Sequence, residues 1–399
     1  MGDNTNLALY GGKPVRSSML PYGHQCIGED DIAAVVDVLR SDWLTSGPKV
    51  TEFEAAFSRY VGADYAVSFS SGTAALHGAS FAAGFGVNDE VITTPMTFCA
   101  TANSVLYQGA KPIFADVCND TLNIDPADVA RRITDHTKGL IAVDYAGHPV
   151  ELDELLELAE ARNLTLIEDA CHALGAEYKG RRVGAISDMS VFSFHPVKHV
   201  TTGEGGMVTT DDEDFAKRLR VFRNHGIDRD AKERQAKGDW YYEMVALGYN
   251  YRLPDILCSL GLSQLKRLDL AVKRRREIAE RYTSAFKKQP GVIPPSVRPD
   301  VKPSWHIYPI RLDLTRLTAG RREIFRALRA EGIGVNVHYV PVHLHPYYRK
   351  RFGYLPGQYP VAETAYEQLI TLPLFSGMAD KDVQNVIEAV AKVISHYAA

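Results

Sequence analysis

The stretch Ser193-Phe194-His195-Pro196-Val197-Lys198-His199-Val200-Thr201-Thr202-Gly203-Glu204-Gly205-Gly206 decides how this sequence is interpreted. It places Lys198 in a turn rich in serine, histidine and glycine, directly after the short apolar segment 189–192. A lysine is costly to bury unless its charge is neutralised or paired. A desolvated lysine amine can form a Schiff base with a carbonyl. Most loop lysines are solvated, so the role of Lys198 depends on the rest of the chain.

Strand-like segments alternate with helical patterns on both sides of this turn. We expect strands at 65–70, 90–94, 112–115, 140–144, 165–168, 189–192 and 207–210, with helices at 74–83 and 152–161. This alternation predicts an α/β fold with a mostly parallel central sheet that is covered on both faces. Ligands of such sheets bind at the carboxyl ends of the strands.

The pattern changes beyond Pro254. A long, charged helical pattern runs to about Tyr282, and we then expect a strand at 307–312, a helix at 321–330, a strand at 334–338 and a final helix at 379–394. With 399 residues the chain exceeds the usual size of a single core. We therefore predict a large α/β domain over 1–253, and a linking helix with a smaller α+β domain over 254–399.

The composition argues against several classes of protein. A net charge of -4 gives no electrostatic reason to expect nucleic acid or a membrane surface as a partner. Five scattered cysteines without a C-x-x-C pair argue against a disulfide framework. Residues 1–10 show no leader pattern, so a cytoplasmic protein is expected. The most basic run, 273–276, is interpreted as the solvated face of a helix.

Two motifs at strand ends suggest a ligand. Ser71-Gly72-Thr73 opens a helix, where glycine permits close backbone approach and free amides face an anion, although an ordinary capped helix start has the same pattern. Asp169 ends a buried strand and needs a cationic or hydrogen-bonded partner. The protonated pyridine nitrogen of pyridoxal 5'-phosphate (PLP) is such a partner, since it makes the ring an electron sink.

Lys198 would complete a PLP site. It would form the Schiff base and then act as the general acid and base, while Ser193 could donate to the phosphate. His172 could reach the ring hydroxyl of the cofactor, with a core histidine as the structural alternative. Each motif is weak alone, and their order along the chain predicts the site.

From Tyr22 to its last helix, the chain resembles the sugar aminotransferases of the DegT/DnrJ/EryC1/StrS family. The resemblance implies PLP-dependent fold type I, as in aspartate aminotransferase. It also implies that Phe98 stacks on the pyridine ring. Asn250 would reach the phosphate in the neighbouring subunit, which implies a homodimer with shared active sites. The cofactor-binding set implied by matching motifs is Ser71, Gly72, Thr73, Phe98, Asp169, His172, Ser193, Lys198 and Asn250.

Further motifs at 21–23, 41–48, 304–309 and 337–343 resemble the branch of this family that acts in pseudaminic acid biosynthesis. That resemblance implies transfer of an amino group from L-glutamate to C4 of a UDP-linked 4-keto-6-deoxy-N-acetylhexosamine, by a ping-pong aldimine and ketimine mechanism. His199 departs from many relatives and weakens the exact substrate prediction. A dTDP-linked or 3-keto sugar is the alternative.

The remaining candidates would contact substrate or an interface, and each has a packing role as its alternative. They are Trp43, Thr45, His306, His338 and His343. No metal site is predicted, because converging ligands cannot be established. A PLP-dependent sugar dehydratase and a non-catalytic regulator are less favoured, since the first typically carries histidine at the position of Lys198 and the second predicts loss of Asp169 or Lys198. No G-x-G-x-x-G opens the first helices, which disfavours a nicotinamide dehydrogenase.

Overall fold

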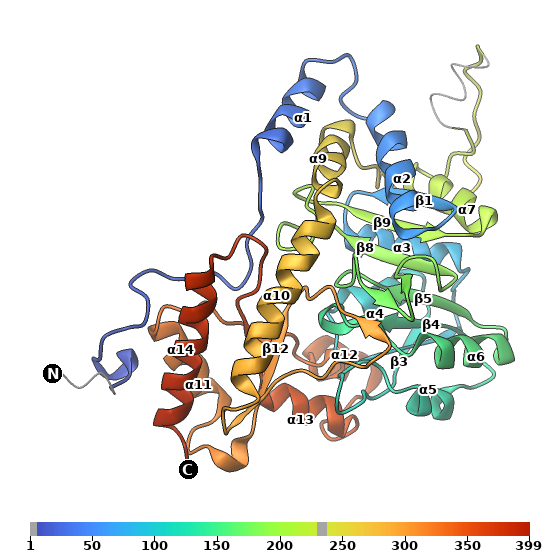
Figure 1. The fold of residues 1–399 in the computed structure, drawn as a ribbon. Coiled ribbons are helices and arrows are strands. Elements are labelled where there is room, and N and C mark those ends of the chain that lie inside the picture. Colours follow the sequence, from blue (N-terminus) through green and yellow to red (C-terminus); the bar gives the residue numbers. More distant parts are fainter. Residues whose placement is uncertain (1–5, 230–237) are drawn as a thin grey trace.

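A seven-stranded sheet organises the first two thirds of the chain in the computed structural model, which describes residues 6–229 and 238–399 (Figure 1). Its order is β1-β9-β8-β5-β4-β2-β3. Only β9 runs antiparallel to its neighbours, so the predicted mostly parallel sheet is confirmed. The strands are β1 (Tyr65–Phe69), β2 (Glu90–Thr93), β3 (Lys111–Phe114), β4 (Thr137–Val143), β5 (Thr165–Asp169), β8 (Met189–Ser193) and β9 (Gly206–Thr210).

Both faces of this sheet are buried. On β8, Val191 packs with the cluster that includes the helices Gly72–Ala82 and Glu213–Arg223, whereas its neighbour Phe192 packs with the cluster that includes the helices Pro48–Val61 and Asp255–Leu265. Successive side chains of a strand point to opposite faces, so a strand covered on both sides is apolar throughout. The helices of this part are α1 (Glu29–Leu39), α2 (Pro48–Val61), α3 (Gly72–Ala82), α4 (Ala100–Tyr107), α5 (Pro126–Arg132), α6 (Leu152–Arg162) and α7 (Glu213–Arg223).

The C-terminal part forms a second core around a three-stranded sheet, β10-β12-β13. Leu7 and Leu20 pack in this core, although the predicted division had assigned the N-terminal segment to the large domain. The elements are α9 (Asp255–Leu265), α10 (Leu268–Phe286), β10 (Val292–Ile293), β11 (Val301–Lys302), β12 (Tyr308–Leu312), α11 (Arg321–Ala330), α12 (Pro346–Phe352), α13 (Pro360–Gln368), β13 (Leu369–Leu372) and α14 (Asp380–His396).

Two predictions for this region are corrected. The long helix is two helices, because Arg267 between α9 and α10 has φ -114° and ψ 10°. The expected strand at 334–338 is not an element of a sheet. Its backbone is divided between two partners, since Gly334 N donates to Leu20 O and Asn336 pairs with Thr371 in an isolated bridge. Between β5 and β8 the chain forms a short hairpin of β6 (Glu177–Tyr178) and β7 (Arg181–Arg182), which β11 extends.

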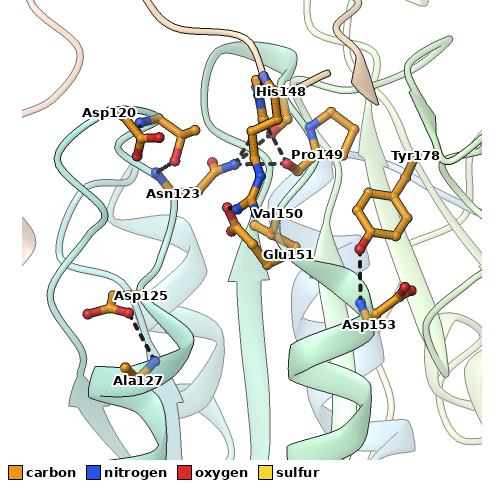
Figure 2. Close-up of polar contacts among 12 residues, drawn as sticks. Asp120, Asn123, Asp125, Ala127, His148, Pro149, Val150, Glu151, Asp153 and Tyr178 are labelled. Carbon is orange, nitrogen blue, oxygen red and sulfur yellow. Dashed lines mark hydrogen bonds and ion pairs between the residues drawn. The ribbon is translucent and has the colours of Figure 1, made fainter. Parts of the chain in front are cut away.

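The crossover from β4 to α6 is held by Asn123, whose side chain points at the backbone of this segment (Figure 2). Its Nδ2 donates to the carbonyl oxygens of His148 and Pro149 at 3.1 and 3.0 Å. Its Oδ1 accepts from Tyr145 N at 2.9 Å. One buried amide thus satisfies three backbone groups that leave the sheet at the end of β4, next to the candidate site.

Across the described ranges, none of the helices combines the length and the apolar character needed to cross a membrane. The first five residues, on which the expectation of no leader sequence partly rests, lie outside the described part of the chain.

Candidate active site

The ends of β1, β5 and β8 meet at one edge of the large sheet. Gly206 on β9 pairs with Phe69 on one side and with Ser193 on the other, so the turn after β1 lies close to the end of β8. Asp169 pairs with Val191 across the parallel β5–β8 ladder. The register therefore brings the three motifs to the same edge, where α/β sheets bind ligands.

The turn at Ser71-Gly72-Thr73 and the end of β8 form a cradle that excludes larger side chains. A Cβ atom on Gly72 would lie 2.9 Å from the Cβ of Ser193, and one on Gly206 would lie 2.4 Å from the carbonyl oxygen of Ser71. Ser71 caps α3 by accepting from Ala74 N at 3.1 Å. The start of an 11-residue helix, a close-packed glycine and two hydroxyl side chains are suited to hold a phosphate.

Asp169 is arranged as an acceptor. It is 4% exposed, its Oδ2 accepts from the Thr101 hydroxyl at 2.7 Å, and its Oδ1 accepts from Cys171 N at 3.3 Å. No cationic side chain of the described residues forms an ion pair with it. A buried carboxylate of this kind has lone pairs left for a protonated nitrogen, and the pyridine ring of PLP carries one.

His172 lies three residues further on, in a cluster of rings. Its Nε2 lies 3.0 Å from the Tyr339 hydroxyl, and its ring centroid lies 4.4 Å from that of His306. Its Nδ1 is buried without a hydrogen-bond partner. Burial lowers the pKa of His172 well below its usual value, and the nearby Lys198 lowers it further. A neutral imidazole with a free ring nitrogen can donate or accept one more hydrogen bond.

Lys198 is half-buried behind the end of β8. Burial lowers the pKa of its amine, and Arg275 adds to this effect, while Cys171 and Asp169 oppose it. The described residues include no ion-pair partner for its Nζ. A lysine held toward its neutral form is a nucleophile and a base. The acceptor Asp169, the phosphate cradle and this amine together fit PLP.

Four other predicted site residues are exposed. Phe98 precedes α4, is 57% exposed, and lies 6.1 Å from Tyr339 between ring centroids. Trp43 and Thr45 lie in the loop before α2, which is attached to α9 because Asp255 N donates to Thr45 O. The Asn250 side chain is exposed as well.

The position of Asn250 bears on the predicted sharing of sites between subunits. The next residue, Tyr251, accepts from Ser70 N at 2.8 Å through its carbonyl oxygen. Asn250 therefore lies beside the Ser71 turn of its own chain. Whether Asn250 serves the site of its own chain or that of a partner subunit is therefore open to a subunit-mixing experiment.

The two remaining histidines differ in their placement. His338 is buried, with its Nδ1 2.9 Å from the Thr371 hydroxyl, and burial with the nearby Lys198 lowers its pKa to about 4. His343 is fully buried 3.0 Å from a Glu363 oxygen. Tyrosine and phenylalanine rings surround His343, so it supports the packing of the C-terminal part and has no surface to offer a substrate.

Three residues at the site had no assigned role in the sequence analysis. Thr101 contacts Asp169, and Tyr339 contacts His172, through tertiary structure. Neither residue belongs to a motif at the end of a strand, so nothing in the sequence indicated these roles. Arg275 belongs to the basic run 273–276, and the interpretation of that run as a solvated face is wrong for it. Arg275 is 2% exposed, because backbone carbonyl groups from three other segments surround its guanidinium.

Comparison with known proteins identifies the class. Residues 25–391 match the DegT/DnrJ/EryC1/StrS aminotransferase family, and the chain belongs to this family. It is therefore a sugar aminotransferase of PLP-dependent fold type I, as the resemblance in its motifs implied.

Its relatives include proteins of polysaccharide and sugar biosynthesis. The chain is 45% identical to the spore coat polysaccharide biosynthesis protein SpsC of Bacillus subtilis, over 95% of this chain and 98% of SpsC. It is 35% identical to Helicobacter pylori PseC, an aminotransferase in pseudaminic acid biosynthesis, with a TM-score of 0.88 over 95% and 100% of the two chains. The PLP form of the putative sugar aminotransferase Spr1654 of Streptococcus pneumoniae is 34% identical, with a TM-score of 0.87 over 94% and 99%.

Proposed function

We propose that this aminotransferase moves an amino group from L-glutamate to C4 of a UDP-linked 4-keto-6-deoxy-N-acetylhexosamine. The reaction is that of the UDP-4-amino-4,6-dideoxy-N-acetyl-β-L-altrosamine transaminase. The likeness to PseC over almost the whole of both chains supports this choice. The motifs at 41–48, 304–309 and 337–343, which lie before and after the site residues along the sequence, support it as well.

The single observation that carries the chemistry is the meeting of Lys198, Asp169 and the Gly72 cradle at one sheet edge. When bound, PLP supplies a carbonyl carbon for the lysine and a ring that withdraws electrons. Asp169 holds the proton on the ring nitrogen, and Gly72, Thr73 and Ser193 hold the phosphate. Lys198 Nζ takes the proton from Cα of glutamate and later delivers a proton to C4 of the sugar.

The residues nearer the surface would bind and orient. Phe98 covers the ring, His172 contacts the ring hydroxyl, and His306 keeps the His172 imidazole in place through their 4.4 Å ring contact. Trp43, Thr45 and His338 line the approach of the nucleotide sugar. Their aromatic and polar character suits a base, a sugar and a diphosphate.

A homodimer with shared active sites is part of this proposal. The segment 240–249 exposes a run of apolar side chains that a monomer would leave in water, with Trp240 at 82%. Consecutive exposed apolar side chains of this kind are typical of a protein–protein contact. The exposed residues of the segment are Trp240, Tyr241, Tyr242, Met244, Val245, Leu247 and Tyr249. A cytoplasmic location stays a prediction from the sequence.

The test is glutamate-dependent amination of a panel of UDP- and dTDP-linked 4-keto and 3-keto sugars, with products identified by NMR. The proposal expects the UDP-linked 4-keto-6-deoxy-N-acetylhexosamine to react with the highest kcat/KM and to yield the 4-amino sugar. Preference for a dTDP-linked or a 3-keto substrate by more than about tenfold, or ~1.4 kcal/mol in transition-state binding, would reject the substrate and keep the class. Loss of a sugar hydroxyl without amination would reject the transferase reaction.

A further inference from the structure

Arg275 is an arginine in an uncommon environment. It lies on α10, which passes between the large sheet and the C-terminal part (Figure 1). At 2% exposure it is buried far more deeply than arginines usually are. Its Nη1 donates at 3.1 Å to each of three carbonyl oxygens, and its Nη2 lies 3.5 Å from a fourth. In order, these belong to Trp305, His306, Leu374 and Val197.

The charge of Arg275 has no counter-ion. No carboxylate of the described residues lies within ion-pair distance of its guanidinium, and its Nε is buried without a partner. The preceding residue, Arg274, pairs with Asp380 at 2.8 Å and with Glu277 at 3.4 Å. A buried cation without a counter-ion is costly, and burial lowers the pKa of Arg275 to about 10. Carbonyl dipoles satisfy the guanidinium but leave a net positive charge inside the protein.

This charge lies at the base of the lysine turn. The Val197 carbonyl directly precedes Lys198, and the His306 carbonyl belongs to the residue whose ring contacts His172. One planar guanidinium therefore connects α10 with the lysine turn and with the segment that carries His306. Its fork of donors suits several carbonyl groups at once, which a lysine ammonium does with less geometric control.

We infer that Arg275 is a positioning residue for Lys198: it fixes the backbone of the lysine turn, and its unbalanced positive charge disfavours a second positive charge on the Lys198 amine. The inference rests on the proposed role of Lys198 as the Schiff-base lysine. The inference gives a function to the buried guanidinium of Arg275, which contacts neither the phosphate cradle nor Asp169.

The charged and titratable groups around Lys198 act in opposite directions. From the end of β5, Cys171 and Asp169 favour the charged amine, whereas Arg275 on α10 favours the neutral one. The histidines that face it are buried and have lowered pKa values, so they contribute little positive charge near neutral pH; they are His172, His199, His306 and His338. Arg275 is thus a buried, permanent positive charge that opposes part of the effect of Asp169 on the Lys198 amine.

The test uses Arg275→Met, the charge-retaining Arg275→Lys, and Arg274→Met as the matched control from the next position of the helix. In each holoenzyme, the visible absorption band is titrated with pH to follow protonation of the Schiff-base nitrogen. After removal of PLP, the rate at which Lys198 is labelled by an amine-acylating reagent is measured against pH by peptide mass spectrometry. The second readout needs no catalysis.

For Arg275→Met we expect both pH profiles to move upward, and Lys198 to be labelled about three- to tenfold more slowly near pH 8, since one pKa unit is a tenfold change in the neutral fraction. Arg275→Lys should retain most of the wild-type profile, and Arg274→Met should stay within about 1.5-fold. Folded Arg275→Met with unchanged profiles would overturn the inference. If that variant does not fold, Arg275→Gln, which keeps two donors without the charge, is judged by the same criterion.

Failure of the proposed function would look different. If borohydride attaches the pyridoxyl group to another lysine in the wild-type protein, the role of Lys198 is wrong. The labelling profile of Lys198 would still report whether Arg275 sets its protonation. The two outcomes are therefore separable.

Discussion

The ends of β4 and β5 lie side by side and each carries a buried aspartate, yet the two carboxyl groups are arranged for opposite tasks. Asp144 N donates to Asp169 O at 3.2 Å, which places the two residues next to each other. Asp169 meets only donors, from Thr101 and Cys171. Asp144 accepts from Val150 N through Oδ1, its Oδ2 is buried without a hydrogen-bond partner among the described residues, and the carboxyl group of Glu168 lies nearby.

Two carboxyl groups that share a buried site cannot both be charged. Burial and the neighbouring Glu168 raise the pKa of Asp144 well above its usual value, and burial raises that of Glu168. Glu168 Oε2 accepts from the Ser190 hydroxyl at 2.7 Å, whereas Asp144 Oδ2 and Glu168 Oε1 have no hydrogen-bond partner among the described residues. The groups that surround each carboxyl group, rather than the residue type or its place at a strand end, therefore decide which aspartate can bind a cation.

The largest expected effect on activity is that of replacing Lys198, which lies at the same sheet edge as Asp169. Lys198→Ala removes the amine that forms the covalent bond and moves the proton, so we expect loss of activity by more than about a thousandfold. The measurement is single-turnover amination with equal amounts of folded protein. Activity within about tenfold of wild type would remove Lys198 from the mechanism.

The second effect is on Asp169 itself. Asp169→Asn replaces an acceptor that can hold a pyridinium by a neutral amide, and we expect the variant to retain PLP but to lose about 30- to 1000-fold in rate, or ~2–4 kcal/mol. Steady-state kinetics with saturating PLP provide the check. A variant within about twofold of wild type would mean that Asp169 is structural, like its neighbour on β4.

A third, smaller effect shows whether the active site around Asp169 is complete within one chain. If Asn250 acts in the partner's site, mixtures of inactive Lys198→Ala and Asn250→Ala subunits should regain about a quarter of wild-type activity. Half of the randomly reassorted dimers are mixed, and each has one intact site of two. The assay requires two folded, nearly inactive parents. No recovery after demonstrated subunit exchange would assign Asn250 to its own chain, beside the Ser71 turn.

The smallest effect is the matched substitution at the end of β4. Asp144→Asn keeps an oxygen for Val150 N and an N–H for Glu168, so activity should stay within about threefold of wild type. A raised folded-state pKa stabilises the protein at low pH and ceases to do so as pH rises toward that pKa. The wild type should therefore lose stability relative to Asp144→Asn as pH rises above about 4, the ordinary pKa of aspartate, and the loss should continue until the pH reaches the raised folded-state pKa.

Denaturant unfolding of both proteins across this pH range measures that difference. Parallel stability curves at all pH values would mean that the pKa of Asp144 is not raised in the folded protein. A large loss of activity in Asp144→Asn would place Asp144 in the site beside Asp169.

Much of the fold could be predicted from the sequence, because apolar strands, helix starts and glycine turns are local signals. The helix Arg321–Ala330 has the predicted bounds, and the three strand-end motifs meet as the parallel sheet requires. The contacts that define the roles are tertiary. Thr101 became a partner of Asp169 through packing of α4, and charge alone could not distinguish buried Arg275 from exposed Lys273 on the same helix. Likewise, the raised pKa values of the neighbouring carboxyl groups Asp144 and Glu168 depend on burial, which leaves no mark in the sequence.

Lys198 is proposed as the lysine that binds PLP in this sugar aminotransferase. This assignment is tested most directly by borohydride reduction of the yellow holoenzyme, followed by proteolysis and peptide mass spectrometry. We expect one pyridoxyl group per chain, on Lys198, and none on Lys198→Ala. A pyridoxyl group on any other lysine of the wild-type protein would contradict the assignment.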